Sequence, residues 1–196
     1  MTSDTVIGVT EIEQDSGAPA FRLTRGRERG YHRAAVDSFL AAARASFEQD
    51  LDELSAADIR EASFPLVKGG YVIGEVDAAL GRIEDAFAAR QRERAVRAEG
   101  VRAWVGRARE EAQVVLDHLT RDRRRLFART GFLSFGYRVD EVDHVAERIV
   151  RYLRDGDALS AEQLRSAAFR MQRRGYREEQ VDALLDATID VILAVR

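Results

Sequence analysis

The chain lacks cysteine and has few histidines. None of its 196 residues is cysteine, which excludes disulfide bridges and thiolate-ligated metals and suits a reducing interior. Three histidines are present, at His32, His118 and His144. Glu141-x-x-His144 matches half of a di-iron helix signature, but a second Glu-x-x-His and two further glutamates in that pattern are missing. The sequence therefore predicts no metal site and no cofactor.

An excess of one charge and long apolar runs are also lacking. The net charge is −3 although 33% of the residues are charged, whereas a nucleic-acid-binding protein usually has a basic excess. No apolar stretch approaches the roughly 20 residues that cross a bilayer. Residues 1–20 also lack the basic start and apolar core of a signal peptide. We therefore expect a cytoplasmic protein without nucleic-acid partners.

Proline is scarce as well. Pro19 and Pro65 are the only two prolines, and Ala, Arg, Glu, Leu and Val dominate the remaining sequence. This composition favours helix along most of the chain. The expected fold class is all-α.

What the chain does contain is the pattern Gly-Tyr-x4-Val-Asp, which occurs four times at unvarying spacing. A chain built from repeats of one small unit is usually a binding or assembly device. The copies, numbered in chain order, are Gly30-Tyr31…Val36-Asp37, Gly70-Tyr71…Val76-Asp77, Gly136-Tyr137…Val142-Asp143 and Gly175-Tyr176…Val181-Asp182.

The four copies form two pairs. Upstream of copies two and four, residues 54–64 align without gaps to residues 159–169, and a Phe lies seven residues before the Tyr. Copies one and three instead have Phe21 and Phe127 ten residues before the Tyr. Successive motif tyrosines lie 40, 66 and 39 positions apart. The duplicated unit is therefore a pair of copies.

Each motif leads into a stretch with helical periodicity. The spacing of apolar residues predicts helices over about 34–54, 139–154 and 178–195. Two short helices are predicted from capping boxes, in which Ser is followed three residues later by Asp or Gln. These boxes are Ser55 with Asp58 and Ser160 with Gln163. Pro65 and the glycines after it then force an extended connection.

A single long helix is predicted from about residue 74 to residue 129. Apolar residues recur at helical spacing from Val76 to Phe87 and again from Val101 to Leu126. The two stripes share one phase, because Phe87 and Val101 are 14 residues, or two heptads, apart. The polar stretch between them would bridge two modules, with Gly100 as a hinge. A break at Gly100 is the alternative.

The residue types of the motif favour a loop that leads into a helix. Glycine permits a sharp turn or a close approach to another segment. Tyrosine can bury its ring while the hydroxyl stays near water or a carbonyl. Valine would be the first core residue of the helix, and aspartate would favour the positive end of the helix dipole. The alternative is that the loop itself is a docking surface.

The motif and its upstream block resemble the N-terminal domain of DivIVA, the bacterial pole and septum organiser. The closest matches are Ile59-Arg60…Phe64…Gly70-Tyr71…Val76-Asp77 and Leu164-Arg165…Phe169…Gly175-Tyr176…Val181-Asp182. The resemblance implies a parallel dimer of helices whose Gly-Tyr loops cross at one tip, followed by a long coiled coil. Because four copies lie in one chain, we expect each pair to form an internal pseudo-dimer.

The chain departs from that family at the membrane-binding position. In the family an exposed Phe three residues before the Tyr inserts into the membrane beside basic residues. Here the corresponding residues are Glu28, Lys68, Ser134 and Arg173. Copy three offers instead the loop Phe132-Leu133-Ser134-Phe135 after Arg123-Arg124-Arg125. This loop either inserts shallowly into a membrane or belongs to the helical core.

The expected architecture is two helical modules, each a pair of DivIVA-like repeats, joined by a long helix. The expected boundaries are a disordered tail over 1–17, the first repeat pair over 18–88, a polar helical linker over 89–100, and a helix plus the second repeat pair over 101–196.

The expected function is that of a non-catalytic scaffold or adaptor, because the motif is repeated four times and no reactive constellation is found. Neither Asp143 nor Asp182, for example, has a matched Ser or His that suggests a nucleophile and base. Such a protein would dock other proteins, with a DivIVA homologue or division component as one candidate, in cell division, polar growth or cell shape. The alternative is a peripheral membrane-surface protein that uses Phe132, Leu133 and Phe135. The resemblance allows placement at the pole, the septum or the inner face of the membrane. Intermolecular coiled-coil assembly into an oligomer is a further alternative.

Overall fold

The computed structural model describes residues 20–51, 53–122 and 125–195. These residues are mostly helical. The tail expected over 1–17 lies outside them. Within the described residues no helix combines the length and the apolar character needed to cross a membrane.

Contacts divide the chain into two compact units, which are described separately. Among the described residues, the first comprises 20–40 and 63–78, and the second comprises those of 41–62 and 79–195. Two helices, α1 (Arg33–Glu48) and α3 (Ile73–Glu99), contribute residues to both units.

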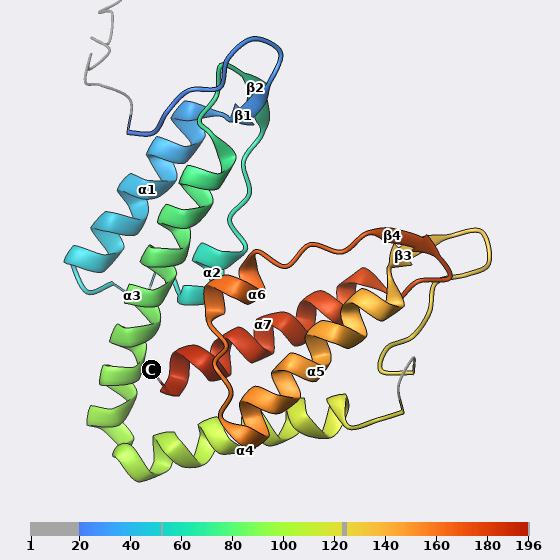
Figure 1. Ribbon diagram of the computed structural model, residues 1–196. Helices are drawn as coiled ribbons and strands as arrows, with labels where there is room; N and C mark the ends of the chain where they lie inside the picture. The colour runs from blue at the N-terminus through green and yellow to red at the C-terminus, as the bar shows by residue number, and fades with distance from the viewer. Residues whose placement is uncertain (1–19, 52, 123–124, 196) are drawn as a thin grey trace, which may run out of the picture. The chain divides into compact units, whose positions relative to one another are not determined.

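The first unit is organised around a two-stranded antiparallel sheet. Strand β1 (Arg29–Tyr31) pairs with β2 (Leu66–Lys68), and Gly30 lies opposite Val67. Helix α1 begins just after β1, whereas a short segment containing Gly70 and Tyr71 separates β2 from α3 (Figure 1). The core of this unit includes three buried residues, Val36, Tyr71 and Val76.

The second unit contains the remaining elements. These are α2 (Ala56–Arg60), α4 (Val101–Leu119), β3 (Phe135–Tyr137), α5 (Val139–Asp155), α6 (Ala161–Arg165), β4 (Met171–Arg173) and α7 (Glu178–Val195). Helix α4 packs against α5 and α7, and α6 packs against α7 (Figure 1). Their apolar faces form one continuous core that includes Val115, Val142, Ile149, Leu164 and Ile192.

Both predicted short helices are present with complete capping boxes. The Ser55 side chain accepts a hydrogen bond from the Asp58 amide, and the Asp58 carboxylate accepts one from the Ser55 amide. Ser160 and Gln163 repeat this arrangement at the start of α6. These bonds satisfy two otherwise unpaired amides at each helix start. The local signal in the sequence was therefore sufficient to predict these two helices.

The prediction of one long helix from 74 to 129 is wrong. Helix α3 ends at Glu99 and α4 begins at Val101, so the two helices meet at a corner (Figure 1). Gly100 has φ 87° and ψ 154°, a conformation that glycine adopts and other residues avoid. Helix α4 also ends at Leu119 rather than near residue 129. A shared apolar phase could not reveal this corner, because it depends on one backbone torsion.

Two smaller corrections concern strands and helix length. Four three-residue strands occur where the sequence predicted loops and, after Pro65, an extended connection. Such short strands exist only through pairing with distant residues. Helix α1 ends at Glu48 rather than near residue 54. Asp50 then adopts a left-handed conformation with φ 57°.

Helices α1 and α3 run in parallel in the second unit. Phe47 and Phe87 occupy equivalent positions, each 16 residues after the motif tyrosine of its own copy. Their rings lie 5.3 Å apart. The Arg90 guanidinium lies over the Phe47 ring at 3.5 Å from its centre. Equivalent residues therefore contact one another across the helix pair.

Candidate docking site at the loop tips

The motif glycines allow two loops to touch through their backbones. A Cβ added to Gly30 would lie 2.1 Å from the Tyr71 carbonyl oxygen, and one added to Gly70 would lie 2.5 Å from the Gly30 carbonyl oxygen. The corresponding distances are 2.2 Å for Gly136 and 2.4 Å for Gly175. No side chain fits at such distances. The sequence analysis gave a sharp turn or a close approach as the role of these glycines, and the structure shows the close approach.

Backbone hydrogen bonds hold each pair of loops together. The amides of Tyr31 and Tyr71 each donate to the carbonyl of the other, both at 2.9 Å. Tyr137 and Tyr176 exchange the same two bonds at the same distance. Copy one therefore pairs with copy two, and copy three pairs with copy four, through identical contacts.

The motif aspartates accept hydrogen bonds from tyrosines of the paired copy. The Tyr71 hydroxyl donates to Asp37 at 3.0 Å, and the Tyr176 hydroxyl donates to Asp143 at 3.0 Å. In the reverse direction, Tyr137 donates to Asp182 at 3.5 Å. The helix-dipole explanation of the aspartates was therefore incomplete, because it considered each copy alone.

These contacts also change tyrosine ionisation. Burial, followed by the hydrogen bond with Asp143, raises the pKa of Tyr176 to about 12. Burial and the neighbouring Asp77 likewise raise the pKa of Tyr31. The phenols of Tyr176 and Tyr31 therefore remain protonated throughout the neutral pH range.

The motif valines are core residues, as the sequence predicted. Val36, Val76, Val142 and Val181 are all buried. The four motif positions thus have structural roles: Gly and Tyr join the paired loops, Asp accepts from Tyr of the paired copy, and Val is buried in the core. Exposed residues at the ends of the paired loops lie between Thr and Gly-Tyr in copies one and three, and on the strands opposite them.

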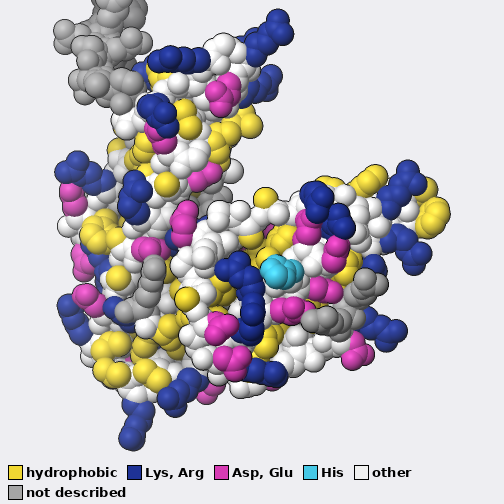
Figure 2. Space-filling view, in the orientation of Figure 1, with side chains coloured by type: hydrophobic (Ala, Val, Ile, Leu, Met, Phe, Trp, Pro, Cys, Tyr) yellow, Lys and Arg dark blue, Asp and Glu magenta, His cyan; other side chains and the backbone are white. Residues whose placement is uncertain are grey.

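We call residues 25–29 with 66–69 the first tip, and residues 131–135 with 171–174 the second tip. In the second tip, Phe132 is 73% exposed, Leu133 is 79% exposed and Phe135 is 53% exposed. Met171 on the paired strand is also exposed. In Figure 2 this end of the molecule shows apolar side chains bordered by arginine. Of the two alternatives for this loop, the structure shows an exposed apolar tip rather than a core segment.

Arginines surround the second tip. The Arg173 guanidinium lies over the Phe135 ring at 5.8 Å from its centre, and that of Arg129 lies over Tyr176 at 5.7 Å. Arg174 is exposed and has a left-handed backbone with φ 55°. Arg170 pairs with Glu141. Arg125 is exposed, and the other two arginines of the run before the loop lie outside the described residues.

The first tip has a similar backbone but a different surface. Thr24 donates to the Gly70 carbonyl, just as Thr130 donates to the Gly175 carbonyl. Gly69 has φ 67°, at the position that Arg174 occupies in the second tip. Its loop nevertheless reads Arg-Gly-Arg-Glu-Arg over 25–29, and all five residues are exposed. The first tip is therefore polar where the second is apolar.

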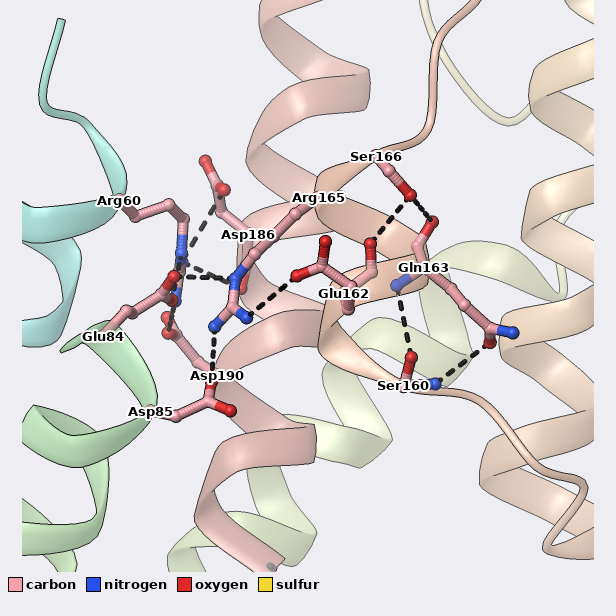
Figure 3. A network of polar contacts seen from close by, with 10 residues as sticks. All are labelled: Arg60, Glu84, Asp85, Ser160, Glu162, Gln163, Arg165, Ser166, Asp186 and Asp190. Atoms are coloured by element: carbon pink, nitrogen blue, oxygen red, sulfur yellow. Dashed lines mark hydrogen bonds and ion pairs between the residues drawn. The ribbon is translucent and has the colours of Figure 1, made fainter. Parts of the chain in front are cut away.

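A separate, polar site lies within the second unit. It joins two halves of the chain, which we define as the residues before and after Gly100. Glu84 on α3 is almost fully buried and lies between Arg60 of α2 and Arg165 of α6 (Figure 3). Arg60 Nε donates to Glu84 Oε1 at 2.8 Å. Arg165 Nε lies 2.7 Å from Glu84 Oε2, although it is not aligned for a hydrogen bond. One carboxylate thus neutralises part of two buried positive charges.

Outer carboxylates complete this cluster. Arg60 donates to Asp190 of α7 at 2.5 Å, and Arg165 donates to Asp85 of α3 at 2.8 Å. Burial alone would lower the pKa of Arg60, but its contacts with Asp190 and Glu84 outweigh burial and raise it. The same balance, with Asp85 and Glu84, raises the pKa of Arg165. Sequence reasoning missed this cluster, because its signal was only the alignment of Arg60 with Arg165.

Among the described residues, no group of three or more metal-binding side chains is close enough to hold an ion. His144 of the half di-iron pattern is exposed on α5. Comparisons with models of protein families, with curated proteins and with solved structures found no match. The functional argument therefore depends on the geometry of the tips and of the cluster.

Proposed function

We propose that the protein is a non-catalytic scaffold or adaptor, built from tandem DivIVA-like repeats in two internal pseudo-dimers, that docks partner proteins through its second tip. The observation that carries this proposal is the exposure of Phe132 and Leu133, at 73% and 79%. Contiguous exposed apolar side chains rimmed by polar residues are typical of interaction sites. Two adjacent apolar side chains at the end of a rigid support are suited to enter a groove on a partner.

The contacts of the repeat motif support a non-catalytic role. Its glycines provide backbone contact, its valines fill the core, and Tyr71 and Tyr176 donate to Asp37 and Asp143. Each side chain therefore has a structural partner. The resemblance to DivIVA then suggests that the assembly belongs to cell division or polar growth.

A fluorescent fusion in dividing cells tests this proposal. We expect the fusion to concentrate at division sites or poles, and Phe132→Ser with Leu133→Ser to disperse it without unfolding the protein. Arg27→Ser with Arg29→Ser, on the first tip, is the control and should leave the pattern unchanged. An even cytoplasmic signal that does not respond to a block of division would contradict the proposal.

The second candidate function is peripheral binding to an anionic membrane surface. The observation that favours it is the combination of exposed Phe132, Leu133 and Phe135 with Arg129, Arg173 and Arg174 beside them. Aromatic and aliphatic side chains insert at the level of the lipid headgroups, while each nearby arginine adds about 1 kcal/mol of attraction to anionic lipid. The same tip could therefore contact lipid instead of protein.

Vesicle flotation separates the two functions. If the membrane candidate is correct, the protein floats with vesicles containing phosphatidylserine, and Phe132→Ser with Phe135→Ser abolishes flotation. If the protein does not float, or if flotation is insensitive to these substitutions, the membrane candidate is wrong. The protein-docking proposal is then tested by the localisation experiment alone.

A further inference from the structure

We infer that two copies of this chain exchange halves at Gly100, so that α2 and α3 of one copy pack against α6 and α7 of the other. The contacts between chains would then be those of the Arg60–Glu84–Arg165 cluster. This inference concerns assembly and does not depend on the proposed function of the second tip.

The cluster has the reciprocal form of an interface between like partners. Arg60 and Arg165 are equivalent, because each is the last residue of its short helix in the aligned blocks. Asp85 and Asp190 are equivalent too, since each lies 14 residues after the motif tyrosine of its copy. Arg60 binds Asp190 and Arg165 binds Asp85 (Figure 3). In symmetric dimers, residue i of one subunit contacts residue j of the other, and j contacts i.

One position breaks this symmetry and selects which halves pair. Glu84 of the first half corresponds to Ile189 of the second half, and both are buried. Two first halves would bury two glutamates together, whereas two second halves would leave two arginines without a central carboxylate. Either arrangement is unfavourable, because the first places two buried carboxylates near each other and the second leaves arginines without a buried counter-charge. A first half therefore pairs with a second half, from the same chain or from another.

The link between the halves favours exchange. A single residue, Gly100, separates α3 from α4. If it adopted helical torsions, the two helices would merge into one, since their apolar stripes already share one phase. A straight helix would carry the second half away from the first. Each half could then find its partner only in another copy, which is the usual origin of exchanged dimers.

An open cleft of about 690 Å³ lies beside the corner, lined among others by Ala88, Gln91, Ala95 and Trp104. Just after the corner, Val101 is 62% exposed and Val105 is 39% exposed. In the exchanged dimer the two straight helices would cross near Gly100, so these valines could be covered by the second copy. The bent arrangement leaves apolar surface hydrated that the dimer can bury.

The matched pair Gly100→Ala and Gly106→Ala tests this inference in the full chain. Alanine is disfavoured at φ 87° but favoured in a continuous helix, whereas Gly106 already lies inside α4 with no heavy atom within 4 Å of an added Cβ. Light scattering after gel filtration should show Gly100→Ala at twice the chain mass of 22.0 kDa. Its dimer dissociation constant should fall about a hundredfold or more, because two hinges contribute. Gly106→Ala should behave as the wild type.

A distance measurement identifies the mode of dimerisation. Spin labels attach only to cysteines introduced at exposed Arg82 and Glu110, because the chain has no other cysteine, and dilution with unlabelled chains isolates the distance within one chain. In a continuous helix these 28 positions span about 42 Å, and the bent form gives a shorter distance. A monomeric Gly100→Ala, or a dimer that keeps the shorter distance within each chain, would overturn the inference.

A third experiment uses the wild-type chain, in case Gly100→Ala does not fold. Wild-type chains with two different affinity tags are unfolded in denaturant, mixed and refolded at increasing concentration. Exchange predicts a mixed-tag dimer that grows with concentration and persists on dilution until the protein is unfolded again. If no mixed dimer forms at any concentration, the inference is wrong.

Discussion

At the first tip, residues 25–29 read Arg-Gly-Arg-Glu-Arg, whereas residues 131–135 of the second tip read Gly-Phe-Leu-Ser-Phe. Both loops are closed by the same threonine-to-carbonyl bond, the same exchange of tyrosine amide bonds and the same glycine contacts. These contacts at the base of each loop are therefore the same, although the five residues that they support differ. This separation allows one support to carry a polar surface in one pair of repeats and an apolar surface in the other.

A similar contrast exists between the two halves at the buried cluster. Glu84 in the first half and Ile189 in the second occupy equivalent positions, yet only the glutamate neutralises arginine. The difference between the two tips changes the surface that a partner would contact. The difference between Glu84 and Ile189 instead affects which halves of the chain can pair.

The largest effect that we expect is at this cluster. Glu84→Gln removes the buried carboxylate between Arg60 and Arg165, so chemical denaturation should show a loss of about 3 to 5 kcal/mol in unfolding free energy. Asp190→Asn, at the exposed rim, is the control and should lower it by less than about 1 kcal/mol. If both variants lowered the unfolding free energy equally, the buried carboxylate would be no more important than the exposed one. Glu84 would then not determine which halves pair.

The next effect concerns the close contact between loops. Gly136→Ala places a Cβ against the Tyr176 carbonyl and should lower the unfolding free energy by about 3 kcal/mol. Gly30→Ala should cause a similar loss, if both pairs of loops depend on the same contact. Gly74→Ala, where an added Cβ meets nothing within 4 Å, is the control and should leave stability unchanged or slightly improved. Tolerance of alanine at Gly136 but not at Gly30 would break the equivalence of the two supports.

Tyrosine variants should give a smaller effect that depends on pH. Tyr176→Phe removes the bond to Asp143 and should lower stability at pH 7 by about 1 kcal/mol. Tyr137→Phe should have less effect, because its bond to Asp182 is longer and more exposed.

The pH dependence follows from the raised pKa of Tyr176, which is about 12. An unfolded tyrosine loses its proton near pH 10, whereas the folded one keeps it to about pH 12. Stability should therefore fall as pH rises through this window. Denaturation curves recorded between pH 9 and 12 should show a shallower fall for Tyr176→Phe than for the wild type. An unchanged slope would exclude Tyr176 as its source.

The smallest effect on stability should come from exchanging the tips. Arg27→Leu with Arg29→Phe places the residues of positions 133 and 135 on the first tip. Because both sites are exposed, the unfolding free energy should change by less than about 0.5 kcal/mol. In cells or vesicles, this variant should restore localisation or flotation to a protein whose second tip has been changed to serine. If binding is not restored, the tip surface alone is not sufficient for docking.

Much of the local structure could be predicted from the sequence. The capping boxes at Ser55 and Ser160 predicted two short helices, and the motif valines predicted four core positions, because both signals act within a few residues. The role of the motif aspartates could not be predicted in this way. Tyr71 reaches Asp37 across 34 residues, and no local pattern contains that pairing.

The sequence by itself determined that the Gly-Tyr-x4-Val-Asp motif occurs four times in a mostly helical chain, because helix periodicity, capping and motif spacing are local properties. Only the tertiary structure decided that the chain bends at Gly100, that Phe132 and Leu133 are exposed, and that Glu84 lies between two arginines. Each of these depends on a backbone torsion or on contacts between distant residues, which the order of residue types along the chain does not specify.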